Sequence, residues 1–319
     1  MRLWSLRVLR VSCLGILAAA LLRPLGRWSS LAELTTNFAP QLLLVAVPLG
    51  GMLSVLGSRR DLFLGFAPFM LLAPVVVPLL VGSPPQIDRS AAPLRVLQYN
   101  VWFQNTSHDS ILAEIEAADA DVVALHELTA TQWTALEPSL RATFPYTITA
   151  PVELPGPHGN GGGKALLSRT PLQEVQVEAE FPLPPLAATT SIAGETVLLI
   201  ALHPSPSRTG DWLIAQRKDK LRSTVAAIAA HEGPAVIITD LNMTPTSSDY
   251  LGLLRELDWD DPRRGLGIAP TYPADGFYGL GLAIDHVLTS PEFAVHDYEL
   301  GDGGGSDHRS LVATLSLAP

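Results

Sequence analysis

The stretch Gly305-Ser306-Asp307-His308-Arg309-Ser310-Leu311-Val312 places an acid and an imidazole side by side, just before an apolar segment that continues to Leu317. Side chains alternate across a strand, so neighbouring residues at its end can point into different parts of one pocket. The carboxylate of Asp307 can hold a divalent metal, and His308 can act as a general acid or base or contact a phosphate oxygen. A surface Asp-His pair before a last strand has the same pattern, so the assignment depends on the rest of the chain.

Charge divides the 319-residue chain into a basic first third and an acidic remainder. Residues 1–93 hold eight arginines and three acids, a net charge of +5, and the whole chain carries −10, so residues 94–319 carry −15. An acidic domain repels a long polyanion such as DNA unless it builds a local basic patch. The densest basic run, residues 217–222, is typical of a helix face, so we expect no stable nucleic-acid partner. The single cysteine, Cys13, leaves no disulfide within the chain and no thiolate metal site.

The first third contains three apolar runs, which predict transmembrane helices at about residues 8–25, 40–57 and 62–82. The second and third runs are uncharged and long enough to cross a hydrocarbon core of ~30 Å. The first run has a basic start, so a cleaved signal peptide is an alternative, although the two later runs favour a span. A buried pair of soluble helices is a further alternative.

Arginine placement predicts the orientation of these spans. Arg2, Arg7 and Arg10 lie before or at the start of the first span, and Arg59 and Arg60 lie between the second and third. Both groups therefore belong on the cytoplasmic side. Arg23 and Arg27 count against this orientation. With three spans, the chain after Gly82 lies outside the cytoplasm. We therefore expect a multi-pass cell-membrane protein with a membrane region at 1–82, a linker at 83–93 and an extracytoplasmic catalytic domain at 94–319.

Strand-like segments of the last domain end in polar residues. Residues 94–100 alternate and end at Asn100, and residues 121–127 end at Glu127. A third strand, 196–202, is followed by His203. Each residue has a structural alternative, such as a helix-capping Glu127 or a structural His203, but carboxylates at strand ends are well placed to share a metal.

Two later strands bring further acids. Residues 235–239 lead to Asp240 and Asn242, whose spacing of two puts both side chains on one side of an extended chain. There the acid can accept a proton from water and the amide can support the acid or a developing oxyanion, although a turn acid and turn amide would look alike. Asp285 lies in an apolar run and needs a partner. That partner is His308, His286 or a backbone donor.

A glycine-rich stretch, residues 159–164, ends in Lys164. Its glycines can let backbone approach a phosphate, with the lysine adding charge, but no P-loop pattern is present. A flexible loop before a strand is the alternative interpretation.

Taken in order, these residues resemble the endonuclease/exonuclease/phosphatase superfamily over about residues 94–319. The set that carries the resemblance is Asn100, Leu125-His126-Glu127, Leu202-His203, Thr239-Asp240-Leu241-Asn242, Ile284-Asp285-His286 and Ser306-Asp307-His308. The resemblance implies an α/β (α+β) four-layer sandwich, in which two mainly antiparallel sheets are flanked by helices. Two departures, His126 where many members have Gln and Leu202-His203-Pro204 in place of Thr-His-Leu, affect the expected substrate contacts more than the metal chemistry.

The resemblance also implies a role for each site residue. The expected metal ligands are Glu127, Asn100 and Asp307, holding Mg²⁺ with Mn²⁺ as an alternative ion. The expected catalytic residues are Asp240 on the attacking water, Asn242 as its partner, His203 on the phosphate, His308 on the pentacovalent phosphate, and Asp285 orienting His308. Such a site is that of a metal-dependent hydrolase of phosphate esters.

The apolar N-terminal runs narrow the resemblance to a membrane-anchored branch similar to the teicoplanin-resistance phosphatases. That likeness implies hydrolysis of a lipid-linked phosphate such as undecaprenyl pyrophosphate outside the cytoplasmic membrane. An extracytoplasmic nuclease of the same fold and a membrane-anchored binding domain with a dead site are the two alternatives. The complete set of site residues argues against the dead site.

Overall fold

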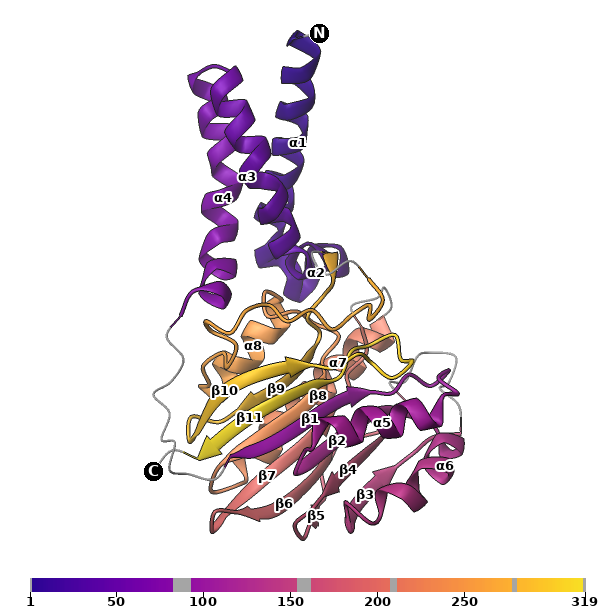
Figure 1. Cartoon of the computed structure of the whole chain (residues 1–319). Helices are drawn as coiled ribbons and strands as arrows, with labels where there is room; N and C mark the ends of the chain where they lie inside the picture. Colours follow the sequence, from indigo (N-terminus) through magenta and orange to yellow (C-terminus); the bar gives the residue numbers. More distant parts are fainter. Residues whose placement is uncertain (1, 83–92, 154–161, 207–210, 277–279, 318–319) are drawn as a thin grey trace. The chain divides into compact units, whose positions relative to one another are not determined.

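The computed structural model describes residues 2–82, 93–153, 162–206, 211–276 and 280–317. The chain forms two units (Figure 1). The first comprises Met1–Gly82, Thr244–Gly252 and Arg263–Ile268, and the second comprises Ser83–Met243, Leu253–Pro262 and Ala269–Pro319. The predicted linker, apart from Pro93, lies outside the described residues.

The first unit is built mainly from helices in the first 80 residues. They are α1 (Arg2–Leu22), a 3-10 helix (Arg23–Trp28), α2 (Ser30–Asn37), α3 (Ala39–Leu56) and α4 (Arg59–Leu80). Three segments are long and apolar enough to cross a membrane: Ser5–Gly26, Ala39–Leu56 and Arg59–Leu80. Large apolar side chains such as Val11, Val55 and Phe63 are exposed, which suits contact with lipid rather than water.

Small residues allow α3 and α4 to pack closely. A Cβ atom added at Gly50 would lie 2.3 Å from the carbonyl oxygen of Gly65, so the two backbones approach where both residues lack side chains. Small residues commonly mark close packing between membrane helices. Arg10 of α1 forms a two-pronged ion pair with Asp61 of α4, with N–O distances of 2.7 and 2.8 Å, which joins the first helix to the last.

Two sheets form the second unit (Figure 1). The six-stranded sheet has the order β10-β11-β1-β2-β4-β3, and the five-stranded sheet has the order β5-β6-β7-β8-β9. The strands of the first sheet are β1 (Leu94–Asn100), β2 (Val122–Leu128), β3 (Tyr146–Ala150), β4 (Gly163–Ser168), β10 (Phe293–Leu300) and β11 (Leu311–Leu317). The strands of the second are β5 (Gln173–Val175), β6 (Leu186–Ile192), β7 (Glu195–Leu202), β8 (Ala235–Asp240) and β9 (Asp285–Thr289).

Each sheet is antiparallel except for one parallel pair, β1 with β2 and β7 with β8. The sheets pack face to face, with β1 against β8 and β9 and β4 against β7. Helices α5 (His108–Ala118) and α6 (Ala130–Leu140) cover the first sheet, α7 (Asp211–Ala229) contacts β7, and α8 (Ser248–Leu257) follows β8. The predicted four-layer sandwich with two mainly antiparallel sheets is confirmed.

Alternation along β1 decides which residues reach the space between the sheets. Leu97 and Tyr99 point into the apolar core under α5 and α6, together with Ile111 and Trp133. The intervening residues of the strand point the opposite way, towards the second sheet. The polar end of β1 therefore faces the polar ends of β7 and β8.

Candidate active site

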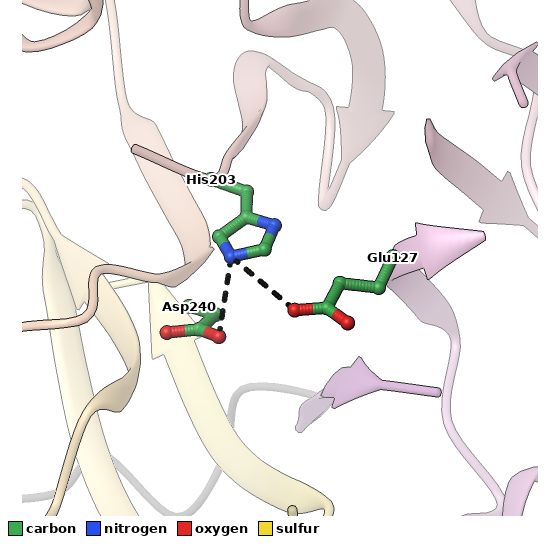
Figure 2. Close-up of side chains that lie close together, drawn as sticks. All are labelled: Glu127, His203 and Asp240. Carbon is green, nitrogen blue, oxygen red and sulfur yellow. Dashed lines mark ion pairs between the residues drawn. The ribbon is translucent and has the colours of Figure 1, made fainter. Parts of the chain in front are cut away.

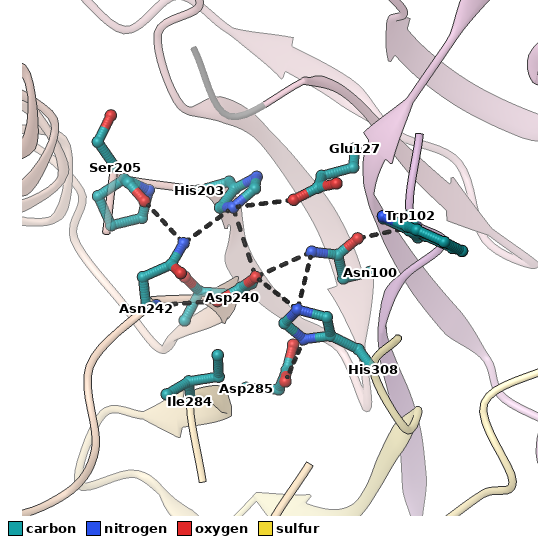
Figure 3. Close-up of polar contacts among 12 residues, drawn as sticks. Asn100, Trp102, Glu127, His203, Ser205, Asp240, Asn242, Ile284, Asp285 and His308 are labelled. Atoms are coloured by element: carbon teal, nitrogen blue, oxygen red, sulfur yellow. Dashed lines mark hydrogen bonds and ion pairs between the residues drawn. The ribbon is translucent and has the colours of Figure 1, made fainter. Parts of the chain in front are cut away.

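The strand ends bring most of the predicted residues together (Figure 3). Asn100 ends β1 and Glu127 lies one residue before the end of β2, while His203 follows β7 and Asp240 ends β8. Because β1 runs parallel to β2 and β7 runs parallel to β8, these ends meet at one edge of each sheet. All four residues lie within the second unit.

Asn100 connects the two sheets. Its Nδ2 donates a hydrogen bond of 2.9 Å to Oδ2 of Asp240 and lies 3.5 Å from Nε2 of His308. Its Oδ1 accepts a hydrogen bond of 2.9 Å from the backbone N–H of Trp102, which fixes the orientation of the amide. The backbone carbonyl of Asn100 also accepts from the hydroxyl of Ser306, so the loop before His308 is tied to the end of β1.

His308 pairs with Asp285. Of the three partners that the sequence offered for Asp285, the structure therefore selects His308. Its Nδ1 lies 2.9 Å from Oδ2 of Asp285, whereas His286 contacts the carbonyl of Met243. Burial opposes a charge on His308, but the carboxylates of Asp285 and Asp240 outweigh it and raise the pKa of His308 to about 10. The imidazole is therefore protonated at neutral pH and can donate a hydrogen bond from Nε2.

Asp240 is fully buried and lies between two histidines. Its Oδ2 is 3.4 Å from Nε2 of His203 and 3.8 Å from Nε2 of His308. Burial and the charge of Asp285 raise the pKa of Asp240 to about 7, although His308 and Asn100 favour its ionised form. A carboxylate that titrates near neutrality suits a general base.

Asn242 holds both Asp240 and His203. Its backbone N–H donates to Oδ1 of Asp240 at 2.8 Å, and its side-chain nitrogen lies 3.1 Å from Nε2 of His203. The same nitrogen donates to the carbonyl of Pro204 at 3.2 Å. Asn242 adopts a positive φ of 55°, a conformation that asparagine tolerates better than most residues and that turns its amide back towards the strand end.

Glu127 leaves the strand ladder at a bulge between His126 and Leu128, with φ at 58°. Its Oε1 lies 3.9 Å from Nε2 of His203 (Figure 2). Gly162 packs against it so closely that an added Cβ would lie 2.5 Å from the Cα of Glu127. Burial raises the pKa of Glu127, and the nearby charge of Asp307 acts in the same direction.

Buried acceptor oxygens at this position fit a hard divalent cation. Oδ1 of Asp307 is buried and has no hydrogen-bond partner among the described residues. Ligand atoms of Glu127, His203 and Asp240 lie within 4.8 Å of one another, as do those of Asp240, Asp285 and His308. Carboxylate oxygens and imidazole nitrogens are both ligands that divalent metals take in proteins, so these groups can hold a metal ion. The geometry adds His203 and Asp240, which the sequence analysis gave other roles, to the residues that can share a metal.

Several further residues around the site were not predicted from the sequence. Tyr272 lies beside His308, with ring centroids 5.0 Å apart, and is partly exposed. The backbone N–H of Phe103 donates to Oε2 of Glu127 at 3.4 Å. Gln98 reaches Asp285 from β1. Only Gln98 carried a usable signal, since it lies two residues before Asn100 and therefore on the same face of the strand.

Lys164 belongs to strand β4, not to a phosphate-binding loop. It is buried, and its Nζ donates to the carbonyl of Leu183 at 3.3 Å. The preceding stretch 159–161 of the glycine-rich segment lies outside the described residues. Burial lowers the pKa of Lys164 to about 8.

Replacing Lys164 by an apolar residue tests how much its buried ammonium group destabilises the fold. Lys164→Met should raise the free energy of unfolding at pH 7 by about 3–4 kcal/mol, because burial lowers the pKa from 10.5 to about 8 and each pKa unit is worth ~1.4 kcal/mol. Since the folded pKa lies below the unfolded value, the gain is complete below pH 8 and disappears as pH rises to 10.5. Thermal unfolding of the detergent-solubilised chain at pH 7 and pH 10 measures it, with exposed Lys218→Met as the control. A lower melting temperature for Lys164→Met at both pH values would contradict this expectation.

Comparison with known proteins agrees with the geometry. Residues 97–308 match the model of the endonuclease/exonuclease/phosphatase family. The fold is similar to that of an endonuclease/exonuclease/phosphatase protein from Beutenbergia cavernae, with 23% identity, a TM-score of 0.55 and coverage of 71% of this chain and 72% of the other. The human Nocturnin catalytic domain, solved with a sulfate anion, shows 22% identity, a TM-score of 0.55 and coverage of 71% and 95%.

A third similar structure is a beta toxin from Staphylococcus aureus, with 18% identity, a TM-score of 0.52 and coverage of 69% and 99%. No curated protein matches the sequence. The fold of two packed sheets and the cluster of acids, amides and histidines at their strand ends agree with this family, whose members are hydrolases of phosphate esters. The chain belongs to the endonuclease/exonuclease/phosphatase family.

Proposed function

We propose that the protein is a membrane-anchored, magnesium-dependent hydrolase that acts on a lipid-linked phosphate, with undecaprenyl pyrophosphate as the expected substrate. The observation that carries the lipid assignment is the presence, in one chain, of this site and of three helices apolar enough to cross a membrane. Helices that cross the membrane would hold the site close to a substrate that is itself anchored in the membrane. The proposal places the protein in a branch similar to the teicoplanin-resistance phosphatases, with a role in the cell envelope or in glycopeptide resistance.

In the proposed reaction, water attacks phosphorus and the bond to the leaving oxygen breaks. Asp240 accepts the proton of the attacking water, and Asn242 holds the carboxylate through its backbone N–H. Protonated His308 donates a hydrogen bond to an oxygen of the phosphate, with Asp285 holding its other nitrogen. His203 contacts the phosphate from the opposite sheet.

The residues expected to hold the divalent ion are Glu127, Asn100 and Asp307. When bound, Mg²⁺ would neutralise phosphate charge and polarise the bond to the leaving group. Oδ1 of Asp307 is buried without a hydrogen-bond partner in the part of the chain that the structure describes, and burial raises the pKa of Glu127. Both observations support this assignment, because a cation would supply the charge that both carboxylates need.

Charge favours the lipid over a nucleic acid. Residues 94–319 carry −15, and an acidic surface repels a long polyanion more strongly than it repels one phosphate on a lipid. The arginines before the first span and between the second and third support an extracytoplasmic catalytic domain. A tethered nuclease of the same fold is the second candidate, because the family includes nucleases.

Two assays of the detergent-solubilised full chain with Mg²⁺ distinguish the two candidates. One measures inorganic phosphate released from the lipid, and the other measures DNA strand cleavage by fragment length, because cut DNA keeps its phosphate on a strand end. Undecaprenyl pyrophosphate is compared with single- and double-stranded DNA, beside the His308→Ala variant. We expect phosphate from the lipid in the wild type and almost none in the variant. Cleaved DNA with intact lipid would overturn the proposal in favour of the nuclease.

A further inference from the structure

Gln98 lies next to the catalytic histidine's partner without touching the histidine itself. Its side-chain nitrogen donates a hydrogen bond to Oδ1 of Asp285, while Oδ2 of the same carboxylate lies 2.9 Å from Nδ1 of His308. Gln98 and Asp285 are both 0% exposed and His308 is 5% exposed. The three side chains form a buried row of contacts. Gln98 lies on β1, Asp285 lies on β9, and His308 lies three residues before β11.

Strand β1 contacts the row formed by Gln98, Asp285 and His308 at both of its ends. Gln98 and Asn100 are two residues apart, so they point to the same side of the sheet. Gln98 holds the carboxylate behind His308, while Nδ2 of Asn100 lies 3.5 Å from Nε2 at the front of the ring and donates to Asp240 at 2.9 Å. One short segment of backbone therefore places an amide next to each end of the Asp285–His308 pair.

If Gln98 only filled space in the core, burying its amide would lower the stability of the fold. Its Oε1 is buried and has no hydrogen-bond partner among the described residues. A buried acceptor left without a donor destabilises the fold, and an apolar side chain of similar size would avoid that cost. The donor nitrogen, in contrast, has a specific acceptor in Asp285.

We propose that Gln98 is a positioning residue that fixes the carboxylate plane of Asp285 and, through it, the ring of His308. An aspartate held at one oxygen can rotate about its terminal bond, whereas donors on both oxygens define its plane. Partners behind a functional histidine fix the ring orientation in this way at metal sites, where losing them costs 10- to 100-fold. This role rests on the function proposed above, because it requires His308 to act on the substrate.

The test removes the donor while keeping the volume. Gln98→Met should lower kcat for undecaprenyl pyrophosphate by about 10- to 100-fold and change KM by less than about twofold. The melting temperature should change little, because the substitution leaves Oδ1 of Asp285 without its donor but also removes the unpartnered Oε1 of Gln98. Gln98→Leu is the second variant in case Met packs poorly.

A double-mutant cycle separates positioning from a purely structural role. In the Asp285→Asn background, Gln98→Met should cause little further loss, because the residue through which it acts has already changed. An equal fold loss in both backgrounds would overturn the proposal, as would wild-type kcat in both Gln98 variants.

A readout without substrate keeps this inference distinct from the proposed function. Proton NMR of the full chain in micelles should show a downfield signal for the His308 Nδ1 proton that is lost in Asp285→Asn and shifted in Gln98→Met. An unshifted signal in Gln98→Met would overturn the positioning role. A shifted signal in a protein that hydrolyses no phosphate substrate would uphold the positioning geometry and defeat the proposed function instead.

Discussion

Asp240→Asn is expected to lower kcat by about 10³-fold, within the range that a general base contributes. Asparagine keeps the shape of the side chain, and its oxygen can still accept the backbone hydrogen bond from Asn242. Its amide nitrogen replaces the oxygen that accepts from Asn100 and cannot take a proton from water. Because Asp240 is buried beside Asp285, removing its charge should not lower the melting temperature. Steady-state phosphate release and thermal unfolding are measured on the same preparation.

A matched control is Asp297→Asn, an exposed aspartate on β10, which should keep wild-type turnover. If Asp240→Asn retained near-normal kcat, Asp240 would not be the base. A lost melting transition would show instead that the charge is structural. Both results would contradict the assigned role.

His308→Ala is expected to lower kcat by about 10²- to 10³-fold, the effect of removing one hydrogen-bond donor to a developing negative charge. The raised pKa of His308 keeps the ring protonated at neutral pH, so the wild type presents both charge and donor there. The substitution leaves Asp285 buried without its cationic partner, and some loss of stability is expected. Phosphate release from the same lipid substrate measures the effect.

The control for His308→Ala is His231→Ala, because His231 follows α7 outside the site and contacts the carbonyl of Thr196. Asp285→Asn supplies a second comparison, since it should weaken the same step by losing the orientation of the ring. Unchanged kcat in His308→Ala would remove the histidine from the mechanism.

Local patterns predicted the fold because strands and helices in this chain follow their expected periods. The apolar alternation of 94–100 and the polar residue at its end became β1 and Asn100 as expected, and the basic run 217–222, expected on a helix face, lies in α7 (Asp211–Ala229). The pairing of Asp285 with His308 depended on a contact between residues 23 positions apart in sequence, which alternation alone left open. The family resemblance supplied the expectation that Asp285 orients His308.

Other features of the site depend on tertiary structure that no short pattern encodes. Glu127 points into the site because a bulge and a positive φ turn it away from β2. Lys164 looked like a loop residue because it follows glycines, yet it is a buried strand residue. Tyr272 reaches His308 from a loop whose sequence gives no periodic signal.

The most direct test of a metal-dependent phosphate site is a Mg²⁺ titration of phosphate release after chelation, comparing wild type with Glu127→Gln. We expect the chelated wild type to be inactive and to recover fully with Mg²⁺. The variant should need at least about tenfold more Mg²⁺ for half-maximal activity, because an amide is a weaker ligand than a carboxylate. Full activity after chelation, or the same titration curve for both proteins, would contradict the account.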